Sequence, residues 1–250
     1  MLFAICTVAV APIRKLPYHV SEMTSQLLFG ETMQVIEEVQ GGWLKIKTSF
    51  DNYEGYCHPL QVKEISASEF ENYTTCLTLE WSGRLHITNE IMHLPMGSNL
   101  SSLLVKDTGT YQGKIIDAIY LDFDEETIRS IAFNFLNTPY LWGGKSVYGI
   151  DCSGLTQSVF KFFGITLSRD AQQQSTQGDV VNFLQEATCG DLAFFDDADG
   201  NIIHVGILLN TNEILHAHGK VRVDAIDDYG IVNAYGQNRV HKLRLIKRFG

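Results

Sequence analysis

The hydrophobic pattern of this chain changes its period near residue 122, and this change most limits the folds that the chain can adopt. Before that point, short apolar pieces such as GGWLKIKTS and TTCLTLEW are separated by glycine, asparagine and proline, a spacing typical of small β-barrels. After it, DFDEETIRSIAFNFLN has apolar residues three and four apart and acidic residues at its start, which predicts an amphipathic helix. We therefore expect an all-β N-terminal half and a C-terminal half that mixes helices and strands.

The same pattern divides the chain into three predicted domains. Residues 1–70 and residues 71–122 each contain strand-length segments bounded by turn residues, so each is expected to form a small β unit. Residues 123–250 add a second helix, which follows DCSG and ends at Gly164, and strands in GDLAFFD, IIHVGILLN, EILHAHG and VHKLRLIKRF. A chain of 250 residues is long enough for each part to bury a core.

The N-terminal sequence MLFAICTVAVAPIRKLP has two interpretations. It is apolar and contains Ala9-Val10-Ala11, which is similar to a signal-peptide cleavage site, but no basic residue precedes the apolar run and the run is too short to span a bilayer. A phase change in its alternation also suits a β-strand with a bulge. We expect a strand and a cytoplasmic protein; a periplasmic protein with an export signal is the alternative.

Charge and cysteine content restrict the classes of partner. The formal net charge of −10 argues against binding to nucleic acid or to an anionic membrane, because such partners are normally met by basic patches. The five cysteines are an odd number, widely spaced and without a CxxC pair. We expect reduced thiols, with no structural disulfide and no zinc knuckle.

Cys152 is the candidate nucleophile. It precedes the amphipathic run SGLTQSVFKFFG, so it is expected in the first turn of a helix, where the helix dipole and unpaired N–H groups stabilise a thiolate. A lone cysteine at such a position is more often a packed hydrophobic residue. A nucleophile also needs a base, and the base needs a group that orients it.

Three histidines are candidates for these two roles. His204 begins the strand HVGILL, and NTNE can turn the chain so that ILHAHG returns antiparallel beside it. If the numbers of paired residues add up to an even number, His216 and His218 lie on the same face as His204, whereas a register shift of one residue would turn both away. Periodicity alone leaves open which of the two orients His204. A zinc site of these histidines with Cys152 has enough ligands but lacks the short paired spacings of structural zinc sites.

The motifs taken together resemble a known family. The segments YLWGGKSVYGIDCSGL, LSRDAQQQ, GDLAFF, HVGILL and ILHAHG resemble the NlpC/P60 cysteine peptidases in order and spacing over residues 125–250, and the N-terminal segments are similar to bacterial SH3-like domains. The resemblance implies an α+β papain-like (NlpC/P60) catalytic domain preceded by two small all-β SH3-like barrels, with no cofactor and no metal. It also implies that Cys152 is the nucleophile, His204 the base and His216 the orienting residue.

The resemblance extends to a subgroup. SEMTSQLLFGE followed by FDNYEGY is similar to the γ-D-glutamyl-L-diamino acid endopeptidases, which are dipeptidyl-peptidase VI-like enzymes. This implies hydrolysis of the γ-D-glutamyl-diamino acid bond in murein stem peptides that have a free N-terminal L-Ala, releasing L-Ala-D-Glu in cell-wall peptide recycling. The implied partner is the murein-derived peptide, with no nucleic acid and no membrane, and a monomer is expected.

A set of residues is expected to bind this substrate: Glu22, Tyr53, Tyr140, Trp142, Asp151, Ser153, Arg169 and Asp170. Glu22 and Tyr53, in an N-terminal domain that closes one end of the groove, would receive the L-Ala ammonium together with Asp151. Tyr140 is also expected to donate to the oxyanion. All of these residues except Ser153 have a simpler explanation: solvated surface for Glu22, a turn aromatic for Tyr53, a helix cap for Asp151, core aromatics for Tyr140 and Trp142, and a polar loop for Arg169 and Asp170.

Two other functions remain open from the sequence. One is an exported endopeptidase that acts on intact peptidoglycan, with the β domains as wall-binding modules. The other is a non-catalytic peptide-binding protein built on the same fold, although neither the cysteine nor the base is missing here.

Overall fold

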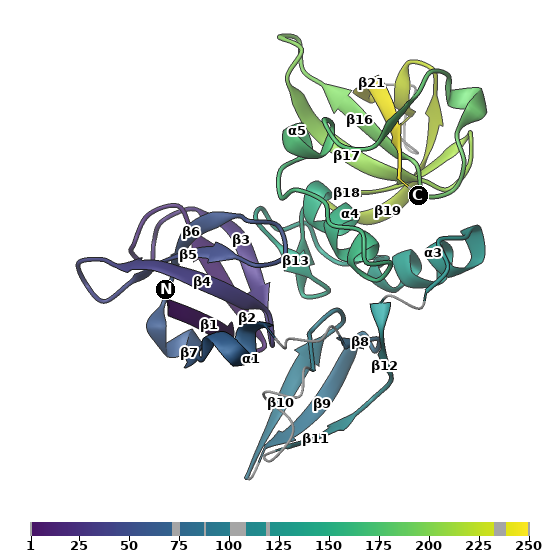
Figure 1. Cartoon of the computed structure of the whole chain (residues 1–250). Coiled ribbons are helices and arrows are strands. Elements are labelled where there is room, and N and C mark those ends of the chain that lie inside the picture. The colour runs from purple at the N-terminus through teal and green to yellow at the C-terminus, as the bar shows by residue number, and fades with distance from the viewer. Residues whose placement is uncertain are drawn as a thin grey trace. The chain divides into compact units, whose positions relative to one another are not determined.

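The structure, a computed structural model, describes residues 2–71, 76–87, 89–100, 109–118, 121–232 and 239–249 (Figure 1). The chain forms two compact units. Unit 1 comprises Met1–Ile119 and Trp142–Tyr148, and unit 2 comprises Tyr120–Leu141 and Gly149–Gly250. Within the described ranges, none of the helices has the length and apolar character needed to cross a membrane.

Unit 1 begins with a seven-stranded antiparallel sheet in the order β3-β2-β6-β5-β4-β1-β7. Its elements are β1 (Leu2–Cys6), β2 (Val10–Arg14), β3 (Met23–Leu28), β4 (Thr32–Glu38), β5 (Leu44–Thr48), β6 (Glu54–Cys57), the 3-10 helix η1 (Pro59–Gln61), β7 (Val62–Ile65) and the helix α1 (Ala67–Glu71). Alternate strand residues such as Ala11 and Ile13, or Met33 and Val35, are buried in one core, as the period of two requires. The β-rich character expected of residues 1–70 is therefore present.

The N-terminal apolar segment forms two strands, and the prediction of a single bulged strand is wrong. β1 pairs with β4 and β7, whereas β2 pairs with β3 and β6. Between them the backbone N–H of Thr7 bonds to the carbonyl of Gln61 at 3.0 Å. The phase change in the sequence marks a crossing between two positions in the sheet, because each strand keeps its own alternation.

Five further strands of unit 1 follow. They are β8 (Leu77–Thr78), β9 (Ser82–Ile87), β10 (Glu90–Pro95), β11 (Gly109–Gln112) and β12 (Ile115–Ile116). β9 lies between β10 and β11, and β8 pairs with β12. Leu85, Leu94 and Leu100 share a small apolar core with Phe29. The described strands thus form a second small β unit, whose SH3-like character stays a prediction.

Trp142–Tyr148 belongs to unit 1 by its contacts. Lys145, in β13 (Lys145–Ser146), donates its backbone N–H to Gln26 Oε1 at 2.8 Å. Gly143 has a φ of +77°, and a Cβ at this position would lie 2.4 Å from the carbonyl oxygen of Met23. Glycine is required here because the segment approaches β3 this closely.

Unit 2 combines short helices with a sheet. Apart from the sheet, its elements are α3 (Glu125–Ala132), η3 (Phe133–Phe135), β14 (Gly149–Ile150), α4 (Cys152–Lys161), α5 (Ala171–Gln174) and η4 (Leu184–Glu186). The strands of the sheet are β15 (Asp179–Val181), β16 (Leu192–Asp196), β17 (Ile202–Leu208), β18 (Glu213–His218), β19 (Lys220–Asp227), β20 (Gly230–Val232) and β21 (Arg239–Arg248). The order is β15-β21-β16-β17-β18-β19-β20, and β20 also pairs with β21, so β16 to β21 close into a ring.

Both predicted helices of unit 2 are confirmed. Asp124 caps α3 by accepting the backbone N–H of Thr127 at 2.8 Å, and acidic residues occupy the first turn, where they suit the helix dipole. After α4 the chain leaves the helix through Gly164, whose φ is +70°. α4 packs against β17 and β18, and this contact positions the site (Figure 1).

Candidate active site

Cys152 is the first residue of α4. Asp151 precedes it in an extended conformation and caps the helix, since its Oδ1 accepts the backbone N–H of Gly154 at 2.7 Å. The cap explains why the helix begins at the cysteine, because it satisfies one of the first unpaired N–H groups. The thiol therefore lies at the positive end of the helix dipole, as predicted.

The thiol of Cys152 is buried, with the residue 7% exposed. The backbone of Ser153 and of Val205, the residue after His204, favours the thiolate and acts to lower the pKa of the thiol. Burial raises the pKa of Cys152 to about 12, and the neighbouring Asp151 carboxylate adds to the rise. The thiol is therefore protonated at neutral pH, and it needs a base in order to attack.

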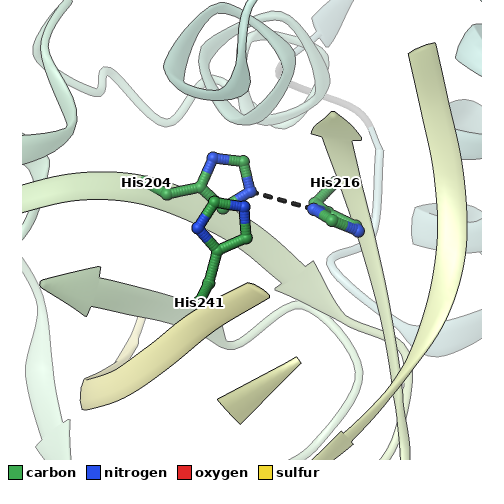
Figure 2. Close-up of side chains that lie close together, drawn as sticks. All are labelled: His204, His216 and His241. Atoms are coloured by element: carbon green, nitrogen blue, oxygen red, sulfur yellow. Dashed lines mark hydrogen bonds between the residues drawn. The ribbon is translucent and has the colours of Figure 1, made fainter. Parts of the chain in front are cut away.

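His204 in β17 and His216 in β18 point toward each other (Figure 2). Gly206 pairs with His216, and these two residue numbers add up to an even number. The even-numbered residues of β17 and β18 therefore share one face, which confirms the expectation that His216 and His218 lie on the face of His204. His204 Nε2 lies 2.9 Å from His216 Nδ1. Gly206 permits this approach, because a Cβ there would lie 2.9 Å from that of His216. The hydrogen bond distinguishes His216 from His218, which periodicity could not do.

Asp224 in β19 extends this chain of hydrogen bonds. Its Oδ2 lies 3.0 Å from His216 Nε2, and its Oδ1 accepts from Arg222 at 2.7 Å. Burial alone would raise the pKa of Asp224, but the hydrogen bonds from His216 and Arg222 outweigh it and lower the pKa. Asp224 is therefore ionised and can only accept hydrogen bonds. Asp224 was not among the residues predicted from the sequence, because no strand was expected over residues 220–227.

The chain of hydrogen bonds fixes the protons on both imidazoles. His216 must donate from Nε2 to Asp224, so its Nδ1 accepts the Nε2–H of His204. His204 Nδ1 is then the unprotonated nitrogen, ready to take a proton. Burial, followed by the neighbouring histidines, lowers the pKa of His204 well below its ordinary value, and burial also lowers that of His216. Both rings are therefore neutral.

His241 in β21 is a member of the cluster that the sequence did not reveal. Its ring stacks on that of His204, with centroids 4.1 Å apart and an interplanar angle of 12° (Figure 2). Burial and the adjacent His216 and His218 lower its pKa to about 4. Nothing in the alternation of VHKLRLIKRF separates this histidine from an ordinary strand residue.

The distances within this cluster suit a metal, but its orientations do not. His204, His216 and His241 place ligand nitrogens within 4.8 Å of one another. The lone pairs of a ring nitrogen lie in the ring plane, and the planes of His204 and His241 are nearly parallel and stacked. One ion cannot lie in both planes, so a tetrahedral zinc site would require His241 to turn.

Asp151, Ser153 and Arg169 form a buried hydrogen-bond network at the start of α4. Arg169 holds both Asp151 oxygens, at 3.0 and 2.6 Å, and also bonds to Ser153 Oγ at 2.9 Å. Asp151 thus caps the helix and pairs with a guanidinium that is 1% exposed. Asp170, in contrast, is exposed at the start of α5. Three of these predicted site residues are together, and their direct contact with substrate stays a prediction.

Tyr140 lies near the nucleophile. Its backbone N–H bonds to the carbonyl of Gly219, and the residue forms a bridge with Ile150, two positions before Cys152. Burial, with the charges of Cys152 and Asp151, raises the pKa of Tyr140 to about 12. The hydroxyl therefore remains a neutral hydrogen-bond donor, which suits the predicted contact with an oxyanion.

The remaining predicted residues lie in unit 1. Trp142 Nε1 donates to Glu22 Oε1 at 2.9 Å, and Lys15 pairs with Glu22 Oε2 at 3.1 Å. The hydrogen bonds from Lys15 and Trp142 lower the pKa of Glu22. Tyr53 packs on the core of the first sheet while its backbone N–H bonds to Thr48 Oγ1. Glu22 and Trp142 are therefore brought together, 120 positions apart in the sequence.

Two family descriptions match the chain at these sites. Residues 137–240, which contain the cysteine and the paired histidines, match the NlpC/P60 family. This segment is an NlpC/P60 domain. Residues 13–58 of unit 1 match the bacterial dipeptidyl-peptidase SH3 domain, and they include Glu22 and Tyr53.

Relatives share both parts. The chain is similar to the gamma-D-glutamyl-L-lysine dipeptidyl-peptidase of Bacillus cereus, with 25% identity over 252 residues covering 88% of this chain and 75% of the relative. It is 26% identical over 244 residues to dipeptidyl-peptidase 6 of Lysinibacillus sphaericus, covering 83% and 86%. Its fold is similar to the crystal structure of an NlpC/P60 family protein from Bacillus cereus, with a TM-score of 0.80, 19% identity and coverage of 98% and 99%. The predicted NlpC/P60 cysteine peptidase with a bacterial SH3 domain is confirmed.

Proposed function

We propose that this protein is a γ-D-glutamyl-diamino acid endopeptidase that releases L-Ala-D-Glu from murein stem peptides with a free N-terminal L-Ala. The observation that carries the proposal is one chain that combines the dipeptidyl-peptidase SH3 domain with two further features: Cys152 at the start of a helix packed on β17, and His204 of that strand bonded to His216. Relatives named for dipeptidyl-peptidase activity over most of this chain support the same substrate class.

The geometry supports acyl transfer through the thiol. His204 Nδ1 takes the Cys152 proton, and the thiolate attacks the γ-carbonyl of D-Glu to give a tetrahedral oxyanion. Tyr140 and the backbone N–H of Cys152 donate to that oxyanion. The imidazolium then gives its proton to the departing amine of the diamino acid. Water, deprotonated by His204, hydrolyses the thioester, which releases L-Ala-D-Glu and restores the thiol.

The free amine of L-Ala is the proposed specificity determinant. Glu22 is ionised, since its pKa is lowered, and Trp142 and Lys15 hold its carboxylate. A carboxylate in this state suits an ammonium group. We assign Glu22 and Tyr53 to this recognition, with a monomeric, cytoplasmic enzyme acting on peptides already released from the wall during recycling.

Mass spectrometry of peptide digests tests the proposal. The substrates are L-Ala-γ-D-Glu-meso-diaminopimelate and the same peptide N-acetylated on L-Ala, with Cys152→Ala as the inactive control. Cleavage of only the free-amine peptide to L-Ala-D-Glu is the expected result. Equal cleavage of both peptides would remove the amine specificity, and turnover by Cys152→Ala would remove the nucleophile. Efficient cleavage of stem peptides still attached to glycan would instead support the exported endopeptidase.

A further inference from the structure

A pocket of about 840 Å³ lies within unit 2, and His241 is one of the residues that line it. Its lining includes Asp196, Ile203, His241, Lys242 and Arg244. His241 connects the pocket to the base, because its ring stacks on that of His204 at 4.1 Å. Cys152, His204 and His216 are not among the residues that line the pocket.

Two β-bulges build the pocket around the end of β16. Phe195 pairs with His204 of β17, but the next residue, Asp196, pairs with Ile202. Ile203 is therefore an extra residue in β17. Along β21 the register passes from Leu245 to Leu243 and leaves Arg244 as an extra residue. Bulges turn side chains out of their regular direction and are common next to active sites. Here both extra residues line the pocket.

Asp196 is the buried charge in this pocket. Its side chain is only 6% exposed, and its Oδ2 lies 3.5 Å from Arg244 Nε. Among the described residues, no donor bonds to its Oδ1. A buried carboxylate oxygen without a donor is costly, and an ammonium group from a ligand would relieve that cost. The neighbouring Asp197 has another role, because it accepts the backbone N–H groups of Asp199 and Asn201 and shapes the turn.

We propose that this pocket binds the side chain of the departing diamino acid and selects diaminopimelate over lysine. The proposal rests on the proposed function. His204 must reach the leaving amine in order to protonate it, so the leaving residue lies on the side of the imidazoles. The distal end of diaminopimelate carries an ammonium and a carboxylate on one carbon. Asp196 suits the ammonium, whereas Arg244 and Lys242 suit the carboxylate. Lysine offers only the ammonium.

Steady-state kinetics with three peptides test each charge separately. The peptides are L-Ala-γ-D-Glu followed by meso-diaminopimelate, L-lysine or L-norleucine. We expect kcat/KM to fall about tenfold with each charge lost, in that order. Asp196→Asn should abolish the preference for lysine over norleucine, and Arg244→Gln should abolish the preference for diaminopimelate over lysine. Preferences that persist in these variants, or equal cleavage of all three peptides by the unsubstituted enzyme, would overturn the proposal.

A matched control and a binding measurement separate this proposal from the proposed function. Asp179→Asn removes one exposed carboxylate from β15 of the same unit and should leave all three values unchanged. NMR titration of Cys152→Ala with free diaminopimelate, in the presence of EDTA, should show binding that norleucine lacks and that a further Asp196→Asn change removes. If no peptide is cleaved, the proposed function fails while this titration still decides the pocket. Absence of diaminopimelate binding would overturn the pocket assignment.

Discussion

The position of one proton decides whether His204 can serve as a base. Arg222 and His216 donate hydrogen bonds to Asp224, and His204 Nε2 donates to His216 Nδ1, which leaves the lone pair on His204 Nδ1. Asp224 determines this tautomer without contacting His204, because an ionised carboxylate only accepts hydrogen bonds. We therefore treat Asp224 as a positioning residue for the base.

Asp224→Asn should lower kcat by about 10² to 10⁴-fold with little change in KM, by analogy with the loss of a carboxylate that orients a catalytic histidine. Arg222 only donates hydrogen bonds, so it would hold the oxygen of the new side-chain amide. The NH₂ group of that amide would then donate to His216 Nε2, which would shift the protons on His216 and on His204 to their other ring nitrogens. Stopped-time peptide assays give kcat and KM. Arg222→Gln keeps the carboxylate beside His216 and should lose far less. Equal losses in both variants would argue against tautomer control.

The raised pKa of Cys152 has a consequence for its reactivity. Without bound substrate, and at pH values below the pKa of about 12, the thiolate fraction should increase about tenfold for each unit by which the pH is raised. Because the pKa of His204 is lowered, its ring is neutral at pH 7 and cannot stabilise a thiolate as an imidazolium. Iodoacetamide should therefore modify Cys152 about 100-fold faster at pH 9 than at pH 7. Peptide mapping identifies the modified cysteine. A rate that is already constant from pH 6 upward would show a thiolate–imidazolium pair instead.

At the scale of elements, α4 and β17 form the site by packing against each other. The helix supplies the thiol at its first residue, and the strand supplies His204. Asp151 holds the start of α4 in two ways, through the cap to Gly154 and the ion pair with Arg169. A buried ion pair contributes little net stability, yet breaking it leaves an uncompensated charge.

Arg169→Leu should destabilise the protein by about 3–5 kcal/mol, because the buried Asp151 carboxylate would lose its ion pair with the guanidinium. Urea denaturation followed by far-UV circular dichroism measures the loss. Arg129→Gln removes an ion pair with Glu125, whose side chain is 65% exposed, and a hydrogen bond to the carbonyl of Leu209, and it should cost less. If the two variants lost the same stability, the buried pair would not hold the start of α4 as described.

At the scale of the whole molecule, the chain separates chemistry from the proposed recognition. Unit 2 contains Cys152, His204, His216 and Tyr140, whereas unit 1 contains Glu22, Tyr53 and Trp142. Trp142 follows Tyr140 closely in sequence but belongs to unit 1 and bonds to Glu22. The division predicts that substrate selection and bond cleavage respond to different substitutions.

Glu22→Gln should raise KM for the free-amine peptide about threefold to tenfold while kcat changes little, because it removes a charge that meets the ammonium and leaves the thiol chemistry intact. Increasing ionic strength should reduce the difference from the unsubstituted enzyme. Steady-state assays at two salt concentrations measure both effects. Lys15→Gln removes the partner charge of Glu22 and should not raise KM, so an equal rise in both variants would contradict the assignment.

Local patterns in the sequence predicted much of this protein. Alternation located strands of both units, and helical periodicity and Gly164 located α3 and α4. The family resemblance of the DCSG and HVG segments predicted catalytic roles for Cys152 and His204, and these roles stay predictions. These local patterns failed where the same hydrophobic pattern fits two different arrangements of strands. The N-terminal phase change is equally compatible with a bulge or with a crossing between sheet positions, and only strand pairing decided for two strands.

The sequence by itself determined which residue types stand at which points of their own helix or strand, because period, capping and turn chemistry act over a few residues. The tertiary structure alone decided which groups from distant strands meet. His241 joins His204, Asp224 orients His216, and Asp196 faces a pocket because of strand register and two bulges. These contacts depend on how β16, β17 and β21 pair, and pairing across tens of residues leaves no periodic trace in any one strand.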